Sequence, residues 1–152
     1  MTEPIIFTSA SPRFSLPLLF AGQAQKEFYV NEAHALTDAL LHCAVEGEAT
    51  DPPVAPAPGD CWIVAATASG AWVGQENSIA CFQAGNWLFV APRNGLRAYN
   101  QVSGQEWLYA NGWQIPQPIA VSTGGATVDA EARAAISAIL AALQQNGVLP
   151  NA

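Results

Sequence analysis

The sequence predicts an α+β protein: an N-terminal helix, a small tryptophan-rich antiparallel β meander or barrel-like sheet, and a C-terminal helix. Two stretches carry apolar residues at three- and four-residue spacing, and between them a short apolar strand, a glycine turn and a tryptophan recur. From these patterns we expect five segments: an extended docking arm over 1–22, a helix over 23–46, a proline-rich linker over 47–59, a β domain over 60–118 and a helix over 127–147.

The first segment mixes apolar residues with turn formers. Pro12 and Pro17 exclude a regular helix here, because proline lacks the amide hydrogen and clashes with the preceding turn. An apolar arm stays in solution only by lying on its own domain or on a neighbour. We therefore predict a docking role for its apolar side chains, Phe14, Leu16, Leu18, Leu19 and Phe20.

The first helix follows Gly22 and is rich in residues that favour helices. Its apolar stripe is narrow, which is typical of a seam between helices. The predicted seam residues are Ala33, Leu36 and Leu40. Four prolines between residues 52 and 58 then predict a stiff spacer.

The β domain is predicted from a repeated turn motif, S-G-A-W at 69–72, A-G-N-W at 84–87 and A-N-G-W at 110–113. A tryptophan that follows a tight turn can pack back across its hairpin. Connections this short favour antiparallel neighbours. We expect strands near 61–65, 79–83, 87–91, 96–100, 106–110 and 113–115.

The second helix has Thr127 as its candidate N-cap and an acid, Asp129, in its first turn, where the helix dipole favours negative charge. Gly147 is expected to end it. Both apolar stripes are too short to be stable alone, so they should pack on each other or on further copies of the chain. The second seam consists of Ile136, Ile139 and Leu143.

Charged residues make up only 11% of the 152 residues, against roughly 25% in typical soluble domains. So few charges indicate that part of the surface is covered, and we expect a homo-oligomer or a subunit of a larger assembly. The net charge of −7 argues against binding to nucleic acid or to anionic membranes.

Processing and redox signals are sparse. No apolar run approaches the roughly 18 residues of a membrane span, and the first ten residues lack a basic signal-peptide region, so we expect cytoplasmic synthesis without membrane insertion. The three cysteines, Cys43, Cys61 and Cys81, form no C-x-x-C pair. We expect them to be buried thiols in a reducing compartment.

The strongest pattern for chemistry is His34, Asp38 and His42, at four-residue steps along the first helix. Eight helical residues span about 12 Å, so the two imidazoles cannot reach one ion. We interpret the pattern as a solvated polar face with a His–Asp contact. The sequence also lacks hydrolase, nucleotide-binding and zinc-protease fingerprints, so we expect no enzyme, no cofactor and no metal.

A carbohydrate-binding surface is the alternative function. A carboxylate or amide beside a stacking tryptophan is common in sugar sites, and Glu76 with Asn77 follows the first of the tryptophan turns. Glu76 and Glu106 could also be read as a glycosidase pair, but thirty residues of separation do not indicate one. The candidate glycan contacts are Trp72, Glu76, Asn77 and Trp87.

Three short motifs stand near the start of the chain, L-P-L-L at 16–19, G-Q-A-Q-K-E at 22–27 and N-E-A at 31–33. They resemble the opening signature of a domain-of-unknown-function family found in bacterial prophages and gene transfer agents. The stretches 70–80 and 129–136 resemble the second signature and the closing helix of the same family. Where that signature has a histidine before Glu76, this chain has Gln75, which argues further against acid–base chemistry there.

The resemblance implies a virion protein associated with tail fibres or head spikes, with no catalytic residues to assign. We therefore predict a structural virion component of a phage or gene transfer agent, the base or adaptor that links the particle to a host-attachment fibre. The expected partners are further copies of the chain, as a trimer for a fibre or a pentamer for a capsid vertex, together with a fibre protein and the capsid or tail protein on which the arm docks. Host polysaccharide is the partner in the alternative. The expected location is the virion, after synthesis in the bacterial cytoplasm.

Overall fold

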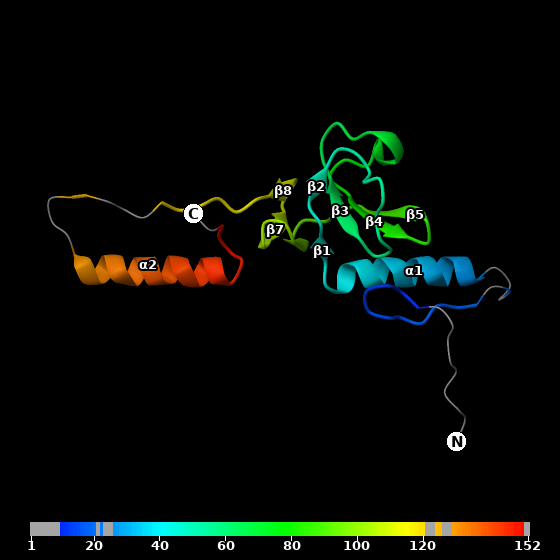
Figure 1. Cartoon of the computed structure of the whole chain (residues 1–152), viewed down its shortest axis with the longest axis horizontal. Helices are drawn as coiled ribbons and strands as arrows, with labels where there is room; N and C mark the ends of the chain where they lie inside the picture. Colours follow the sequence, from blue (N-terminus) through cyan, green and yellow to red (C-terminus); the bar gives the residue numbers. More distant parts are fainter. Residues whose placement is uncertain (1–9, 21, 23–25, 121–123, 126–128, 151–152) are drawn as a thin grey trace, which may run out of the picture. The chain divides into compact units, whose positions relative to one another are not determined.

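The computed structural model describes residues 10–20, 22, 26–120, 124–125 and 129–150. The chain divides into two compact units, residues 1–92 and 93–152, so the predicted β domain over 60–118 spans their boundary. Each unit combines one helix with strands, α1 (Lys26–Leu41) in the first and α2 (Ala130–Gln145) in the second (Figure 1). The predicted α+β class is confirmed.

The first unit contains an open sheet with the order β2 (Glu48–Ala49), β3 (Cys61–Val64), β4 (Ile79–Gln83) and β5 (Asn86–Val90). The predicted antiparallel pairing of the last three strands is confirmed. However, β2 pairs in parallel with β3, with Glu48 opposite Ile63. The long 50–60 connection permits this parallel return, which a tight turn does not. Another short strand, β1 (Ala44–Val45), precedes β2.

Alternating side chains give the two faces of this sheet different partners. One face carries the buried cysteines and isoleucines of β3 and β4. Gln83 and Leu88 of this face line a cavity together with Ala35 of α1, so α1 covers it. The opposite face is aromatic and packs around Trp72, which lies in a short 3₁₀ helix, η1 (Gly70–Trp72).

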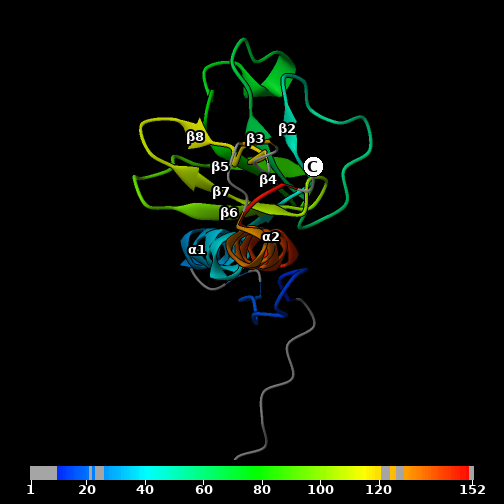
Figure 2. The ribbon, with the colours of Figure 1, turned by 90° about the vertical axis from the view of Figure 1, so that its left-hand side faces the viewer.

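Helix α1 lies between the sheet and the N-terminal arm, as the two perpendicular views show (Figures 1 and 2). Among its described side chains, Ala35, Asp38 and Ala39 are buried. This stripe of small residues lets the helix approach its neighbours closely. This buried stripe is not the predicted seam of Ala33, Leu36 and Leu40. The prediction followed the spacing of the leucines, because leucine is more hydrophobic than alanine.

Residues 47–59 are not the plain spacer that the sequence predicts. They begin with β2, whose backbone bonds to the open edge of β3. The carbonyl oxygen of Thr50 then accepts a 2.9 Å hydrogen bond from the Ser69 amide. The proline content therefore predicted a plain spacer wrongly, because backbone hydrogen bonds attach this segment to the sheet and to the loop that contains Ser69.

The second unit contains an antiparallel sheet of β6 (Arg97–Asn100), β7 (Gln105–Tyr109) and β8 (Trp113–Gln114). Its buried residues include Ala98, Asn100 and Trp107. The Asn100 side-chain oxygen accepts hydrogen bonds from the amides of Val102 and Ser103, both at 3.0 Å, and so shapes the β6–β7 turn. All six strands expected in the β domain are present, with ends that differ by at most one residue.

Helix α2 is capped by Asp129, whose side chain accepts a 2.9 Å hydrogen bond from the Ala132 amide. The expected cap, Thr127, lies outside the described residues. The helix ends as predicted before Gly147, which has a φ of +69°. There the Gly147 carbonyl accepts a 3.1 Å hydrogen bond from the Glu106 amide, which joins the end of α2 to β7.

Candidate functional site

The N-terminal arm is joined to α1 by several side-chain hydrogen bonds. Asp38 is only 2% exposed, and its carboxylate accepts hydrogen bonds from Ser11 Oγ (2.6 Å), the Arg13 amide (3.0 Å) and the Phe14 amide (2.7 Å). A buried carboxylate requires such donors, because removal from water is costly for a charge. The interpretation of Asp38 as part of a solvated face is therefore wrong.

Two further contacts align the arm with α1. The Arg13 guanidinium donates to the carbonyl oxygens of Ala39 (2.9 Å) and His42 (2.6 Å), which a helix end leaves without intrahelical partners. Toward the other end of α1, Asn31 both accepts from the Leu19 amide and donates to the Leu19 carbonyl. The arm therefore runs along α1 in the opposite direction.

The arm is less extended than predicted. Ala10 and Pro17 form an antiparallel bridge, and Ser15 between them has a φ of +52°. Within the described part, 10–20, the chain thus makes a compact turn before it continues along α1. Residues 1–9 of the predicted arm lie outside the described residues.

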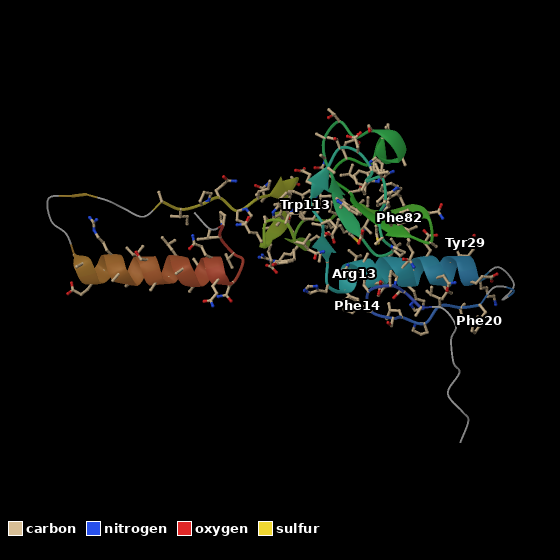
Figure 3. The ribbon with its side chains drawn as sticks, in the orientation of Figure 1. Arg13, Phe14, Phe20, Tyr29, Phe82 and Trp113 are labelled. Carbon is tan, nitrogen blue, oxygen red and sulfur yellow. The ribbon has the colours of Figure 1, made fainter. Side chains whose placement is uncertain are left out.

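Of the five predicted docking residues, two present most surface. Phe14 is 45% exposed and Phe20 is 38% exposed, and they lie near opposite ends of α1 (Figure 3). Leu16, Leu18 and Leu19 are half-buried. The polar contacts therefore fix the arm on its own unit. The Arg13 guanidinium lies over the Phe14 ring, 5.8 Å from its centre, and both phenylalanines keep more than a third of their surface exposed.

The predicted α1 seam does not coincide with the buried face of the helix. Ala33 is exposed, Leu36 is half-buried and Leu40 is 37% exposed. These residues lie outside the buried stripe of α1.

The α2 seam is exposed to a greater degree. Ile136 is 53% exposed and Ile139 is 59% exposed, whereas Leu143 is half-buried. None of the residues from Ala130 to Gln145, all of which the structure describes, is buried. The helix thus presents its apolar stripe to solvent within its unit.

The candidate glycan contacts have different environments. Trp72 is completely buried beneath Trp62 and Trp87, so its ring has no free face for a sugar, and this assignment is corrected. Trp87 is half-buried and packs against Phe82, with ring centres 5.0 Å apart. It therefore retains part of its surface at the edge of the aromatic face.

The acidic candidates are all exposed, but they do not converge in one unit. Glu76 and Asn77 lie in the loop after η1, where the Glu76 side chain accepts a 3.4 Å hydrogen bond from the Gly74 amide. Asn77 has a φ of +67°, which fits a turn role. Glu106 belongs to the second unit, where it pairs with Arg97 at 3.2 Å.

Sequence reasoning missed Arg13 and the role of Asp38. The available signal was Asp38 itself, an acid that interrupts the alanine stripe of α1. A buried acid on a helix requires donors from elsewhere, and the Ser11–Phe14 turn of the arm supplies them. Nothing in the spacing of the arm indicates this pairing.

Within residues 10–20, 26–120 and 129–150, no three His, Cys, Asp or Glu side chains are grouped so that they could hold a metal ion. Neither α1 nor α2 has the length and apolar character that crossing a membrane requires.

These observations define an α+β protein whose apolar side chains are exposed on an arm and on two helices. The chain belongs to the family described as protein of unknown function (DUF2793), which matches residues 30–114. No curated protein and no solved structure matches the chain.

Proposed function

We propose that this protein is a structural virion component of a phage or gene transfer agent, the base or adaptor of a head spike or tail fibre. In this role it forms a homo-oligomer, contacts a capsid or tail protein and carries a fibre protein. The resemblance of its opening and closing motifs to prophage and gene-transfer-agent proteins supports the proposal, as does the low content of charged residues.

One observation carries the proposal: α2 has an exposed apolar stripe and no buried residue. A single helix of 16 residues is marginal in water without packing. Its charges, Glu131 and Arg133, lie in its first turn, and residues 134–145 carry none. We therefore expect that α2 is stable only when another protein surface packs against its apolar stripe.

We propose that the α2 helices of further copies of the chain pack against this stripe. The stripe steps by four, three and four residues from Ala132 to Leu143, which is the spacing of seams between parallel helices. Such a stripe is self-complementary, so rotational symmetry buries every copy equally. A bundle of α2 helices around a three- or fivefold axis satisfies this requirement.

Light scattering on the purified protein tests the oligomer. We expect a discrete trimer or pentamer for the native chain, and mostly monomer for Ile136→Glu, because a charge in the seam loses its hydration. Ala134→Glu is the matched control, since residue 134 lies on the opposite side of α2 and is also exposed. A monomeric native chain, or equal effects of the two substitutions, would contradict the oligomer.

Attachment to the particle is assigned to the arm, through Phe14 and Phe20. Deletion of the arm is a poor test, because it also removes the partners of Asp38. The double substitution Phe14→Ser and Phe20→Ser keeps those bonds and should reduce the amount of the protein in purified particles at least tenfold. Tyr29→Ser, at an exposed residue of α1, is the control. Normal incorporation of the double variant would refute the attachment role.

A carbohydrate-binding module is the second candidate, and the partly exposed Trp87 beside Phe82 favours it. Stacking of a sugar ring would change tryptophan fluorescence during titration with host polysaccharide. That change should disappear in Trp87→Ala. If the native chain shows no response at millimolar sugar-repeat concentrations, this candidate fails while the virion proposal stands.

A further inference from the structure

The fold gathers all three cysteines of the chain in one place. Cys61 on β3 lies directly opposite Cys81 on β4 in the antiparallel register. Cys43, just beyond the end of α1, is close enough to both for their ionisations to interact. All three are free thiols. The sequence separates these residues by about twenty positions each and gives no sign of this grouping.

The position of Cys61 and Cys81 in the ladder determines what they can do. The Phe82 amide donates to the Asp60 carbonyl (2.9 Å), and the Val64 amide donates to the Ser78 carbonyl (2.9 Å). The pairs 60/82 and 64/78 are therefore hydrogen-bonded pairs. Because bonded and non-bonded pairs alternate along an antiparallel ladder, Cys61 and Cys81 form a non-hydrogen-bonded pair. In such pairs the Cα atoms are roughly 4.5 Å apart, which is within the range that a disulfide spans.

The Cys61 and Cys81 side chains also shift each other's pKa. Both are buried on the same face of the sheet. The Cys61 thiol can donate to the Gly59 carbonyl oxygen, 3.5 Å away, and to the Cys81 sulfur. The second contact raises the pKa of Cys61 and lowers the pKa of Cys81. Cys81 is therefore the thiol of the pair that ionises first.

We propose that Cys61 and Cys81 are a covalent modification site that forms an intramolecular disulfide by exchange with a low-molecular-weight disulfide. The Cys81 thiolate attacks one sulfur of the reagent, forming a mixed disulfide and releasing one thiolate of the reagent. Cys61 then loses its proton and attacks the Cys81 sulfur, releasing the second. The reagent disulfide is reduced to two thiols as the two protein thiols are oxidised to one disulfide.

Cys43 is the thiol left over. It has no position in the β3–β4 register, and burial raises its pKa to about 11, so little of it is thiolate near neutral pH. The disulfide would close a loop over residues 61–81, which contains η1 and the buried Trp72. It would therefore fasten the aromatic face of the sheet. This inference does not depend on the proposed virion role.

An equilibrium measurement avoids the slow access of reagents to buried thiols. The full chain is equilibrated in buffers of oxidised and reduced glutathione, in native conditions and in urea, and its thiols are quenched and counted by intact mass. We expect two of three thiols to be lost as an internal bridge. Closing a loop of this length should favour the bridge about 100-fold more in the native state than in urea.

Matched variants identify the bridge. Cys43→Ala should retain the loss of two thiols, whereas Cys61→Ala and Cys81→Ala should lose the native-state preference. Peptide mapping of the native chain should link residues 61 and 81. A bridge that contains Cys43, or a native-to-urea ratio near one, would overturn the proposal. Both outcomes can be read from the native chain, so they do not depend on the folding of a variant.

Discussion

At the scale of single residues, Asp38 holds the N-terminal arm on α1 in the first unit. It is a buried acid on a helix, and its donors all come from a segment some twenty-five residues earlier in the chain. The arm thus satisfies a charge that α1 could not otherwise bury. The sequence does not indicate that residues 11–14 donate hydrogen bonds to Asp38.

Replacement of Asp38 by Ala should lower the free energy of unfolding by about 2–3 kcal/mol, because three donors lose a charged acceptor. The loss is limited by release of the arm, which would let water reach those donors. Urea unfolding measures the stability, and limited proteolysis should show faster cleavage within residues 10–20. Glu32→Ala, an exposed acid on the same helix, should change stability by less than about 0.5 kcal/mol.

Cys43 offers a test by pH. Burial raises its pKa from 9.0 to about 11, so the folded state disfavours the thiolate. Between pH 9 and 11 the folded chain keeps the Cys43 proton, whereas the unfolded chain loses it. The free energy of unfolding therefore has its full value below pH 9 and falls as the pH rises from 9 to 11. At pH 9 about half of the unfolded thiol is ionised, against about one in a hundred in the folded chain. Alkylation followed by peptide mapping should show that difference, and equal rates with and without urea would contradict it.

At the scale of elements, the end of α2 depends on one glycine. Gly147 has a φ of +69°, and an added Cβ would lie 2.9 Å from the Gly104 carbonyl oxygen. Its position beside β7 is further fixed by the hydrogen bond from Glu106. The junction between α2 and the sheet of its unit therefore requires both the backbone conformation and the space that glycine provides.

Gly147→Ala should cost at least about 2 kcal/mol, the sum of a left-handed backbone and a contact with another backbone atom. Gly85→Ala separates the two contributions, because Gly85 has a similar φ of +80° and nothing within 4 Å of its added Cβ. We expect about 1 kcal/mol there. Circular dichroism during thermal unfolding would measure both variants. If they cost the same, the close approach at Gly104 has no energetic effect.

The elements show where sequence patterns succeed. The strands of the β domain could be predicted, because the tryptophan turns at 84–87 and 110–113 have residues with a narrow choice of backbone conformations. The third motif, at 69–72, is not a hairpin turn, since residues 70–72 form the 3₁₀ helix η1. β1 and β2 could not, because two-residue strands leave no periodicity to detect. The buried face of α1 was also missed, since Ala35 and Ala39 carry little hydrophobic weight and Asp38 carries none.

The candidate surfaces were predicted in part. Phe14, Phe20, Ile136 and Ile139 are exposed and apolar, which is what a docking or seam residue requires. Trp72 was a poor choice for a glycan contact, since the sequence does not reveal which tryptophan of the cluster is central. The grouping of the cysteines depends on strand register, and that becomes visible only in three dimensions.

At the scale of the whole molecule, assembly should be driven by apolar contact rather than by charge. Each chain carries a net charge of −7, so copies repel one another, and residues 134–145 of α2 contain no charge that could form an ion pair. Added salt screens the repulsion and leaves the apolar seam intact.

The melting temperature should therefore rise with protein concentration, because an oligomer is stabilised by mass action. The rise should persist, or increase, between about 0.05 M and 1 M NaCl, since the Debye length falls from roughly 14 Å to about 3 Å over that range. Scanning calorimetry over a hundredfold range of concentration measures this. Dissociation at high salt would indicate an ionic interface, and the Ile136→Glu variant should show no concentration dependence.

The bond between the arm and Asp38 also has a consequence for how this chain can change through evolution. The stretch of the chain that matches the family begins at residue 30, within α1, and so excludes Ser11 and Arg13. Asp38 lies inside that stretch, yet its hydrogen-bond donors lie before it. A descendant that exchanged its N-terminal segment for another would inherit a buried carboxylate without partners. The segment and the aspartate should therefore be inherited, or lost, together.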